Sequence, residues 1–255
     1  MLKVAVMTSM NKEYYDHIGS LMLETWSKYW PKEYNLHLYM EGKFEIPKYD
    51  NVIIESWENN CQELHTQFIP KASGPAAKFA KKGFSFLAGM KHINCDILIW
   101  LDADALTYKQ FPKDQIESIL PRKKLVAFFD TLYQTEPEYT SERYLDKTRP
   151  LTACESGFVV MDKRHKSFNV MTKNYETEYT REKRLEYLGD WYDTNVLTAS
   201  VVDLRQHVED LSKLRTTNKT QTPLNKCWIG EYVHHAKGKA KRHKSVDEYR
   251  ATIGL

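Results

Sequence analysis

The stretch Leu98-Ile99-Trp100-Leu101-Asp102-Ala103-Asp104-Ala105-Leu106 decides the fold of this chain. Its apolar run stops at two carboxylates spaced i, i+2, which predicts a buried strand from Ile97 to Leu101 with both acids at its exit. Residues i and i+2 of a strand share a face, and paired carboxylates suit a divalent cation. Open α/β sheets also bind ligands at the carboxyl ends of strands. The alternative is that Asp102 and Asp104 only form a turn, where Asp is common.

The composition fits one α/β domain over residues 1–255. Hydrophobic residues make up 42% of the 255 residues and charged residues 28%, which is enough for a large core. The net charge of +3 is too small to require a nucleic acid or a membrane surface as partner. No apolar stretch has the length of a membrane span or the form of a signal-peptide core. The cysteines form no CxxC pair, which predicts reduced thiols in a cytoplasmic protein.

Strand and helix patterns alternate in the first half, which predicts a mainly parallel sheet with right-handed crossovers. The expected strands are Val4–Met7, Leu36–Met40 and Val52–Ile54, and the expected helices are Glu13–Lys28 and Ala76–His92. A polar turn is expected at Thr8–Asn11, directly after the first strand.

The second half is less regular, and a mixed sheet is expected there. Its expected strands are Leu125–Asp130, Gly157–Met161 and a strand-like segment at Trp228–His235. Helices are expected at His165–Glu178 and around Asp193–Leu197, and polar loops at Glu136–Pro150 and Arg215–Pro223.

The order of these motifs resembles the GT-A-fold glycosyltransferases, in particular the family-eight-like enzymes and related small enzymes. The resemblance rests on Ile97–Asp104, the Gly157–Met161 strand, Asp193-x-Asn195-x-Leu197 and His235-x-x-Gly238-x-x-Lys241. It implies a GT-A type, Rossmann-like, mostly parallel sheet flanked by helices. The first 130 residues would bind the nucleotide sugar, and residues 131–255 the acceptor. The chain departs from the family-eight pattern after Lys241, where Arg242-His243 replaces Pro-Trp, and at Asp193-Thr194-Asn195, where the pattern has Asp-Gln-Asp.

The resemblance also implies ligands and roles for particular residues. Mn²⁺ or Mg²⁺ would be held by Asp102, Asp104 and His235, and would grip the diphosphate of a nucleotide sugar, preferably a UDP-sugar. Contacts to that donor would come from Thr8, Ser9, Asn11, Lys82, Asp102, Ala103, Gly238 and Lys241. Such a cation neutralises the charge that develops on a nucleoside diphosphate leaving group.

An inverting transferase also needs a carboxylate that deprotonates the acceptor hydroxyl. The predicted candidates for this base are Asp193, Asp190 and Glu155. A retaining enzyme would not use a base in this way. The sequence does not separate the two outcomes. The acceptor is a hydroxyl, expected on a glycan.

Simpler interpretations stand beside these roles. Taken alone, His235 is an ordinary loop histidine, Asp190 a helix cap, and Lys82 one of several solvent-facing lysines. Thr8–Asn11 fits a plain capped turn equally well.

Three other functions compete with glycosyl transfer. A sugar-phosphate nucleotidyltransferase would need a glycine-rich, arginine-containing loop after the first strand, but the chain has Thr8-Ser9-Met10-Asn11-Lys12 there. A non-catalytic carbohydrate- or nucleotide-binding protein would bind the donor without turnover. Nucleic-acid binding rests only on the short basic segment 237–244.

Overall fold

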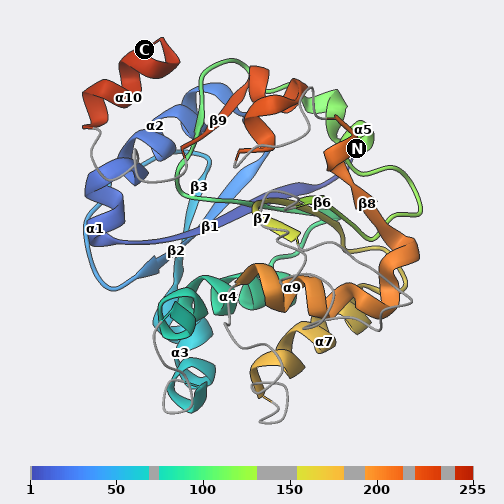
Figure 1. The fold of residues 1–255 in the computed structure, drawn as a ribbon. Helices are drawn as coiled ribbons and strands as arrows, with labels where there is room; N and C mark the ends of the chain where they lie inside the picture. Colours follow the sequence, from blue (N-terminus) through green and yellow to red (C-terminus); the bar gives the residue numbers. More distant parts are fainter. Residues whose placement is uncertain are drawn as a thin grey trace.

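The strand that precedes the two aspartates, β4 (Ile97–Leu101), lies in the middle of a large sheet (Figure 1). The structure is a computed structural model, and it describes residues 2–68, 75–130, 154–180, 193–214, 222–236 and 245–254. The other strands of the sheet are β1 (Val4–Asn11), β2 (Asn35–Glu41), β3 (Val52–Ser56), β6 (Val126–Asp130), β7 (Cys154–Asp162) and β8 (Val208–Asp210).

Within the described residues this sheet has seven strands in the order β3-β2-β1-β4-β7-β6-β8. β1 pairs in parallel with β2 and β4, β2 with β3, and β6 with β8. Only β7 is reversed, because it pairs antiparallel with both β4 and β6. The sheet is therefore mostly parallel in its first half and mixed in its second, as the sequence predicts.

Helices cover both faces of the sheet (Figure 1). One face carries α3 (Trp57–Phe68), α4 (Pro75–His92), α7 (Phe168–Thr180) and α9 (Asp193–Val201). The other face carries α1 (Lys12–Tyr14), a π-helix η1 (Tyr15–Gly19), α2 (Ser20–Tyr29) and α10 (Val246–Ile253). Short helices fill the connections: η3 (Lys113–Gln115), α5 (Ile116–Ile119), η5 (Val202–His207), η6 (Leu211–Leu214), η7 (Leu224–Lys226) and η8 (Trp228–Glu231).

Strand side chains alternate between two hydrophobic cores, one on each face. In β4, Ile97, Ile99 and Leu101 join the core under α2 and α10. Leu98 and Trp100 join the core under α3, α4, α7 and α9. The apolar residues of β4 are buried on both faces, which is why this strand is a continuous hydrophobic run rather than an alternating one.

A second, two-stranded sheet lies on the α2 side. It pairs β5 (Ala105–Thr107) with β9 (Val233–His235), and the antiparallel register sets Ala105 opposite His235. This pairing joins segments that are far apart in the sequence, and it brings the C-terminal part of the chain to the end of β4. No helix in the described part of the chain has both the length and the apolar character of a membrane span.

Two segment predictions are wrong. Thr8–Asn11 is not a turn, because β1 continues to Asn11 and pairs with β2 as far as Glu41. Trp228–His235 is a strand only from Val233, since Trp228–Glu231 forms the 3₁₀-helix η8. Helix α3 was not expected, and the expected loops 136–150 and 215–221 lie outside the described residues.

Candidate functional site

The two aspartates lie at the carboxyl end of β4, in the turn that joins it to β5. The Asp102 amide donates to the Gly157 carbonyl of β7 (2.9 Å), and the Ala105 amide donates to the Asp102 carbonyl (2.9 Å). The Ala236 amide, just past β9, donates to the Asp104 carbonyl (3.0 Å). The turn is therefore held by the main sheet on one side and by the small sheet on the other.

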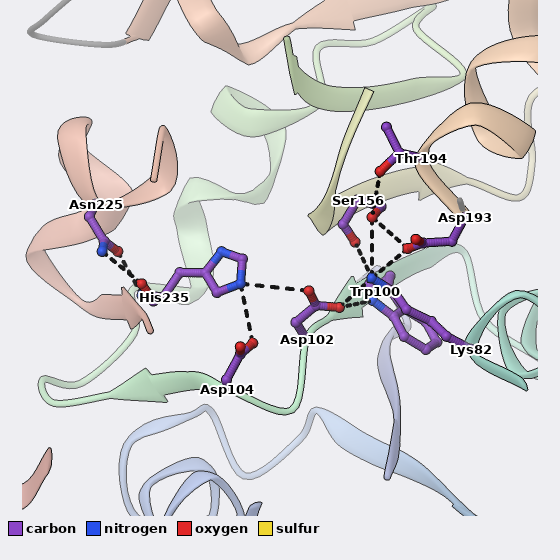
Figure 2. Close-up of polar contacts among 9 residues, drawn as sticks. All are labelled: Lys82, Trp100, Asp102, Asp104, Ser156, Asp193, Thr194, Asn225 and His235. Atoms are coloured by element: carbon purple, nitrogen blue, oxygen red, sulfur yellow. Dashed lines mark hydrogen bonds and ion pairs between the residues drawn. The ribbon is translucent and has the colours of Figure 1, made fainter. Parts of the chain in front are cut away.

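Asp102, Asp104 and His235 converge in this turn (Figure 2). His235 Nε2 lies 3.2 Å from Asp104 Oδ1 and 3.6 Å from Asp102 Oδ2. One ligand atom from each residue lies within 4.8 Å of the others. Asn225 fixes the histidine backbone, since His235 N–H donates to its Oδ1 (2.6 Å) and its Nδ2 donates to the His235 carbonyl (2.9 Å). The structure thus brings together the predicted metal ligands.

Lys82 of α4 joins this cluster to a third carboxylate, that of Asp193 (Figure 2). Its Nζ lies 2.6 Å from Asp102 Oδ1 and 2.6 Å from Asp193 Oδ2. The Ser156 hydroxyl donates to Asp193 Oδ2 (2.6 Å) and accepts from Lys82 Nζ (3.2 Å). The indole N–H of Trp100 donates to Asp102 Oδ1 (2.8 Å). Asp102 therefore stands between the histidine and the lysine, and Asp193 is oriented by two donors.

The charges in the cluster influence one another strongly because little water reaches them. Burial opposes ionisation of Asp102, but Lys82 and His235 outweigh it and hold the Asp102 pKa well below its usual range. Burial also disfavours protonated His235, yet Asp104 and Asp102 raise the pKa of His235 to about 9. For Lys82, burial lowers the pKa, but the charges of Asp102 and Asp193 outweigh burial and raise it above its usual value.

A glycine makes room for the histidine ring. A Cβ atom on Gly157 of β7 would lie 2.2 Å from His235 Cε1 and 2.9 Å from both His235 Nδ1 and Glu155 Oε1. A glycine inside a strand is typical of such a close approach. Glu155 is 2% exposed and lies on the same face of β7, and its charge contributes to the raised pKa of His235.

The cluster fits a divalent cation. Asp102, Asp104 and Asp193 supply three carboxylates, whereas Lys82 supplies one ammonium group, so negative charge is in excess around His235. Carboxylates are ligands that both Mn²⁺ and Mg²⁺ prefer, and an imidazole nitrogen is a ligand of divalent transition-metal ions, so the full set of three suits Mn²⁺ better than Mg²⁺. Asp104 is 2% exposed and His235 1% exposed, which places the ligand atoms in a dry, enclosed position.

The other predicted donor contacts lie at the ends of β1 and β4. Thr8 is fully buried in β1, Ala103 is 5% exposed, and the Asn11 side chain accepts the Tyr14 amide (2.8 Å) as the cap of α1. Ser9 hydrogen-bonds to Glu41 of β2, which is half-buried. The predicted roles of Gly238, Lys241 and Asp190 fall on residues outside the described part of the chain.

Several residues of the cluster were not found from the sequence. Asn225 reaches it through a contact between distant segments, which no local pattern reveals. In the sequence, Ser156 precedes the expected strand Gly157–Met161 and resembles an ordinary polar boundary, whereas in the structure it lies within β7. Gly157 carried a usable signal, because a glycine in a strand interior marks a close approach.

Comparisons with known proteins identify the fold. A scan against models of protein families gave no match, and neither did a search of curated proteins. Among solved structures, a galactosyltransferase LgtC in complex with donor and acceptor sugar analogs superposes with a TM-score of 0.60 at 12% identity, covering 98% of this chain and 95% of that one. The mannosyltransferase Ktr4p from S. cerevisiae gives 0.53 at 12% identity, covering 100% and 82%. Mouse xyloside xylosyltransferase 1 gives 0.50 at 11%, covering 81% and 84%.

These identities are low, so the likeness establishes the fold. The chain has the GT-A fold that these glycosyltransferases share, and the fold class predicted from the sequence is confirmed. The Asp102-x-Asp104 pair, which directly follows β4, fits the Asp-x-Asp pattern predicted from the sequence.

Proposed function

We propose that this protein is a metal-dependent glycosyltransferase that moves a sugar from a nucleoside-diphosphate sugar, preferably a UDP-sugar, to a hydroxyl group of a glycan. The observation that carries the proposal is the convergence of Asp102, Asp104 and His235 within 4.8 Å at the carboxyl edge of a GT-A sheet. Carboxyl edges are where open α/β sheets bind nucleotides.

The chemistry of the substrate explains why such a cluster is useful. When the glycosidic bond of a nucleotide sugar breaks, negative charge develops on the diphosphate that leaves. Mn²⁺ or Mg²⁺ held by Asp102, Asp104 and His235 would neutralise this charge. Lys82 would add an ammonium group close to the same position, and Gly238 and Lys241 are proposed as further diphosphate contacts. Thr8, Ser9, Asn11 and Ala103 are proposed contacts to the rest of the donor.

Asp193 is the proposed base for the acceptor hydroxyl. Lys82 and Ser156 hold its carboxylate in one orientation at 2.6 Å each, which favours a defined approach of the acceptor. Glu155 and Asp190 are the alternatives. In this proposal residues 1–130 bind the donor and residues 131–255 bind the acceptor. His235 is the metal ligand that comes from the second of these two parts.

Binding calorimetry with Mn²⁺ and UDP tests the metal site directly. Wild-type protein should bind UDP more tightly with Mn²⁺ than with EDTA, and Asp104→Asn should abolish that difference. Asp16→Asn is the matched control, because this acid is exposed and pairs with Lys12 on the protein surface. The metal role is refuted if the UDP affinity is the same with Mn²⁺ as with EDTA and is unchanged by Asp104→Asn.

Turnover assays then separate a transferase from a binding protein. Release of UDP from a panel of UDP-sugars should depend on Mn²⁺, and Asp193→Asn should lower turnover more than donor affinity. Metal-dependent nucleotide binding with no release from any nucleotide sugar, with and without glycan acceptors, would instead indicate a non-catalytic binding protein.

A further inference from the structure

Trp100 of β4 lies two positions before Asp102, and its indole ring reaches the Asp102 carboxylate (Figure 2). Residues i and i+2 of a strand project from the same face, which brings the two side chains together. The indole N–H donates a hydrogen bond to Asp102 Oδ1 (2.8 Å). Trp100 is 1% exposed, and its ring packs against Phe86 of α4 with the ring centroids 5.4 Å apart. The core of the protein therefore holds this donor in place.

The hydrogen bond occupies only one of the two carboxylate oxygens. Oδ1 accepts the indole N–H and also lies 2.6 Å from Lys82 Nζ. Oδ2 lies 3.6 Å from His235 Nε2, on the side of the cluster that Asp102 forms with Asp104 and His235. Because both donors bind Oδ1, they leave Oδ2 directed toward the predicted metal ligands.

Of the two donors to Oδ1, Trp100 has the more defined geometry. Lysine is long and flexible, and its ammonium group donates in several directions. The indole N–H donates in one direction only, and its ring is buried. The same ring also contacts the lysine, since Lys82 Nζ lies 5.4 Å from the ring centroid, within the range of a cation–π contact. Trp100 therefore contacts both members of the Lys82–Asp102 ion pair.

A simpler interpretation is that Trp100 only satisfies its own N–H, because a buried indole N–H usually finds a hydrogen-bond partner. Trp30 is such a case in this chain. It is also 1% exposed, and its N–H donates to the Thr107 hydroxyl (2.7 Å). Trp100 differs in its acceptor, which is a carboxylate whose other oxygen faces the predicted metal ligands.

We propose that Trp100 is a positioning residue, whose indole N–H holds Asp102 Oδ1 so that Oδ2 is presented to the divalent cation. This inference rests on the proposed metal site and adds a residue that acts on the metal through Asp102. Groups that hydrogen-bond to metal ligands orient those ligands, and their loss typically lowers metal affinity by about 10- to 100-fold.

Two variants at position 100 test this role. Trp100→Phe removes the N–H and keeps an aromatic ring. A second variant carries benzothienylalanine, in which sulfur replaces the indole N–H, so that the volume and shape of the ring are kept even if the phenylalanine variant does not fold. Mn²⁺ affinity is measured without nucleotide, by electron paramagnetic resonance of the free ion, alongside the melting temperature in EDTA. Both variants should bind Mn²⁺ about tenfold more weakly than wild type.

Trp30→Phe is the matched control, because it removes a buried indole N–H whose acceptor is the Thr107 hydroxyl. It should lower the melting temperature and leave the Mn²⁺ affinity near the wild-type value. The inference is wrong if the benzothienylalanine variant binds Mn²⁺ as tightly as wild type, or if Trp30→Phe loses as much affinity as the variants at position 100. If folded wild-type protein binds no Mn²⁺, the metal site of the proposed function is itself wrong, and the role of Trp100 falls with it.

Discussion

Replacing Lys82 with methionine should destabilise the protein strongly. The Lys82 side chain is 19% exposed, and its ammonium lies 2.6 Å from both Asp102 Oδ1 and Asp193 Oδ2. The side chains of these acids are only 20% and 9% exposed, so water cannot replace the lysine well. Methionine keeps most of the volume and the helix propensity but leaves two nearby carboxylates without their shared cation.

The magnitude follows from this geometry. Removing one partner of a buried ion pair costs about 3–5 kcal/mol, because the other charge stays buried and uncompensated. In a chain of this size, 1 kcal/mol corresponds to about 2–4 °C in melting temperature. We therefore expect Lys82→Met to lower the melting temperature by about 10 °C.

Urea unfolding and thermal unfolding in EDTA measure this loss. Lys81→Met is the control, because the adjacent Lys81 is 41% exposed and lies 4.0 Å from its acidic partner Glu41. A surface pair of this kind is worth about 0–1 kcal/mol. A further variant, Lys82→Met with Asp193→Asn, should be less destabilised than the sum of the single changes, because it removes one of the uncompensated charges. Equal losses for Lys82→Met and Lys81→Met would refute the buried-network argument.

Two further predictions concern His235. Gly157→Ala should weaken Mn²⁺ affinity, because the new Cβ would lie 2.2 Å from His235 Cε1 and would displace the imidazole ring. Calorimetry measures the affinity, and a wild-type value would contradict the close approach. In EDTA, the raised pKa of about 9 for His235 should stabilise the fold by roughly 3 kcal/mol. This contribution is fully present below the unfolded pKa near 6.5 and is lost as the pH rises through about 9. Unfolding at pH 6 and pH 9.5, compared between wild type and His235→Asn, checks the sign: the difference between the two proteins should shrink at the higher pH.

Local sequence patterns predict the centre of this fold well. The run Ile97–Leu101 is buried on both faces, so its hydrophobicity alone reveals a central strand, and the carboxylates that follow can only stand at its exit. The reversed strand β7 is an apolar run as well, but its direction depends on pairing with β4 and β6. Direction is a property of the whole chain path, which explains why the sequence predicts a mixed sheet without saying which strand is reversed.

The errors have equally local causes. Thr8–Asn11 is polar and resembles a turn, yet its backbone is held by parallel pairing with β2 up to Glu41. Helix α3 buries only Trp57, Cys61 and Phe68, so its apolar stripe is too sparse to be seen in a polar sequence. In both segments, contacts made elsewhere in the fold outweigh the local pattern.

The composition of the site explains why part of it escaped prediction. The two oxygens of Asp102 have different partners: Oδ1 pairs with Lys82 from one face of the sheet, and Oδ2 approaches His235 from the other. One carboxylate therefore links the cluster of Asp104 and His235 to the cluster of Lys82 and Asp193. Lys82 and protonated His235 both stabilise the ionised form of Asp102. If either is lost, the ionised form of Asp102 depends more strongly on the one that remains. The site therefore behaves as one electrostatic unit, and its energetics depend on which segments meet at the end of β4 more than on any single motif.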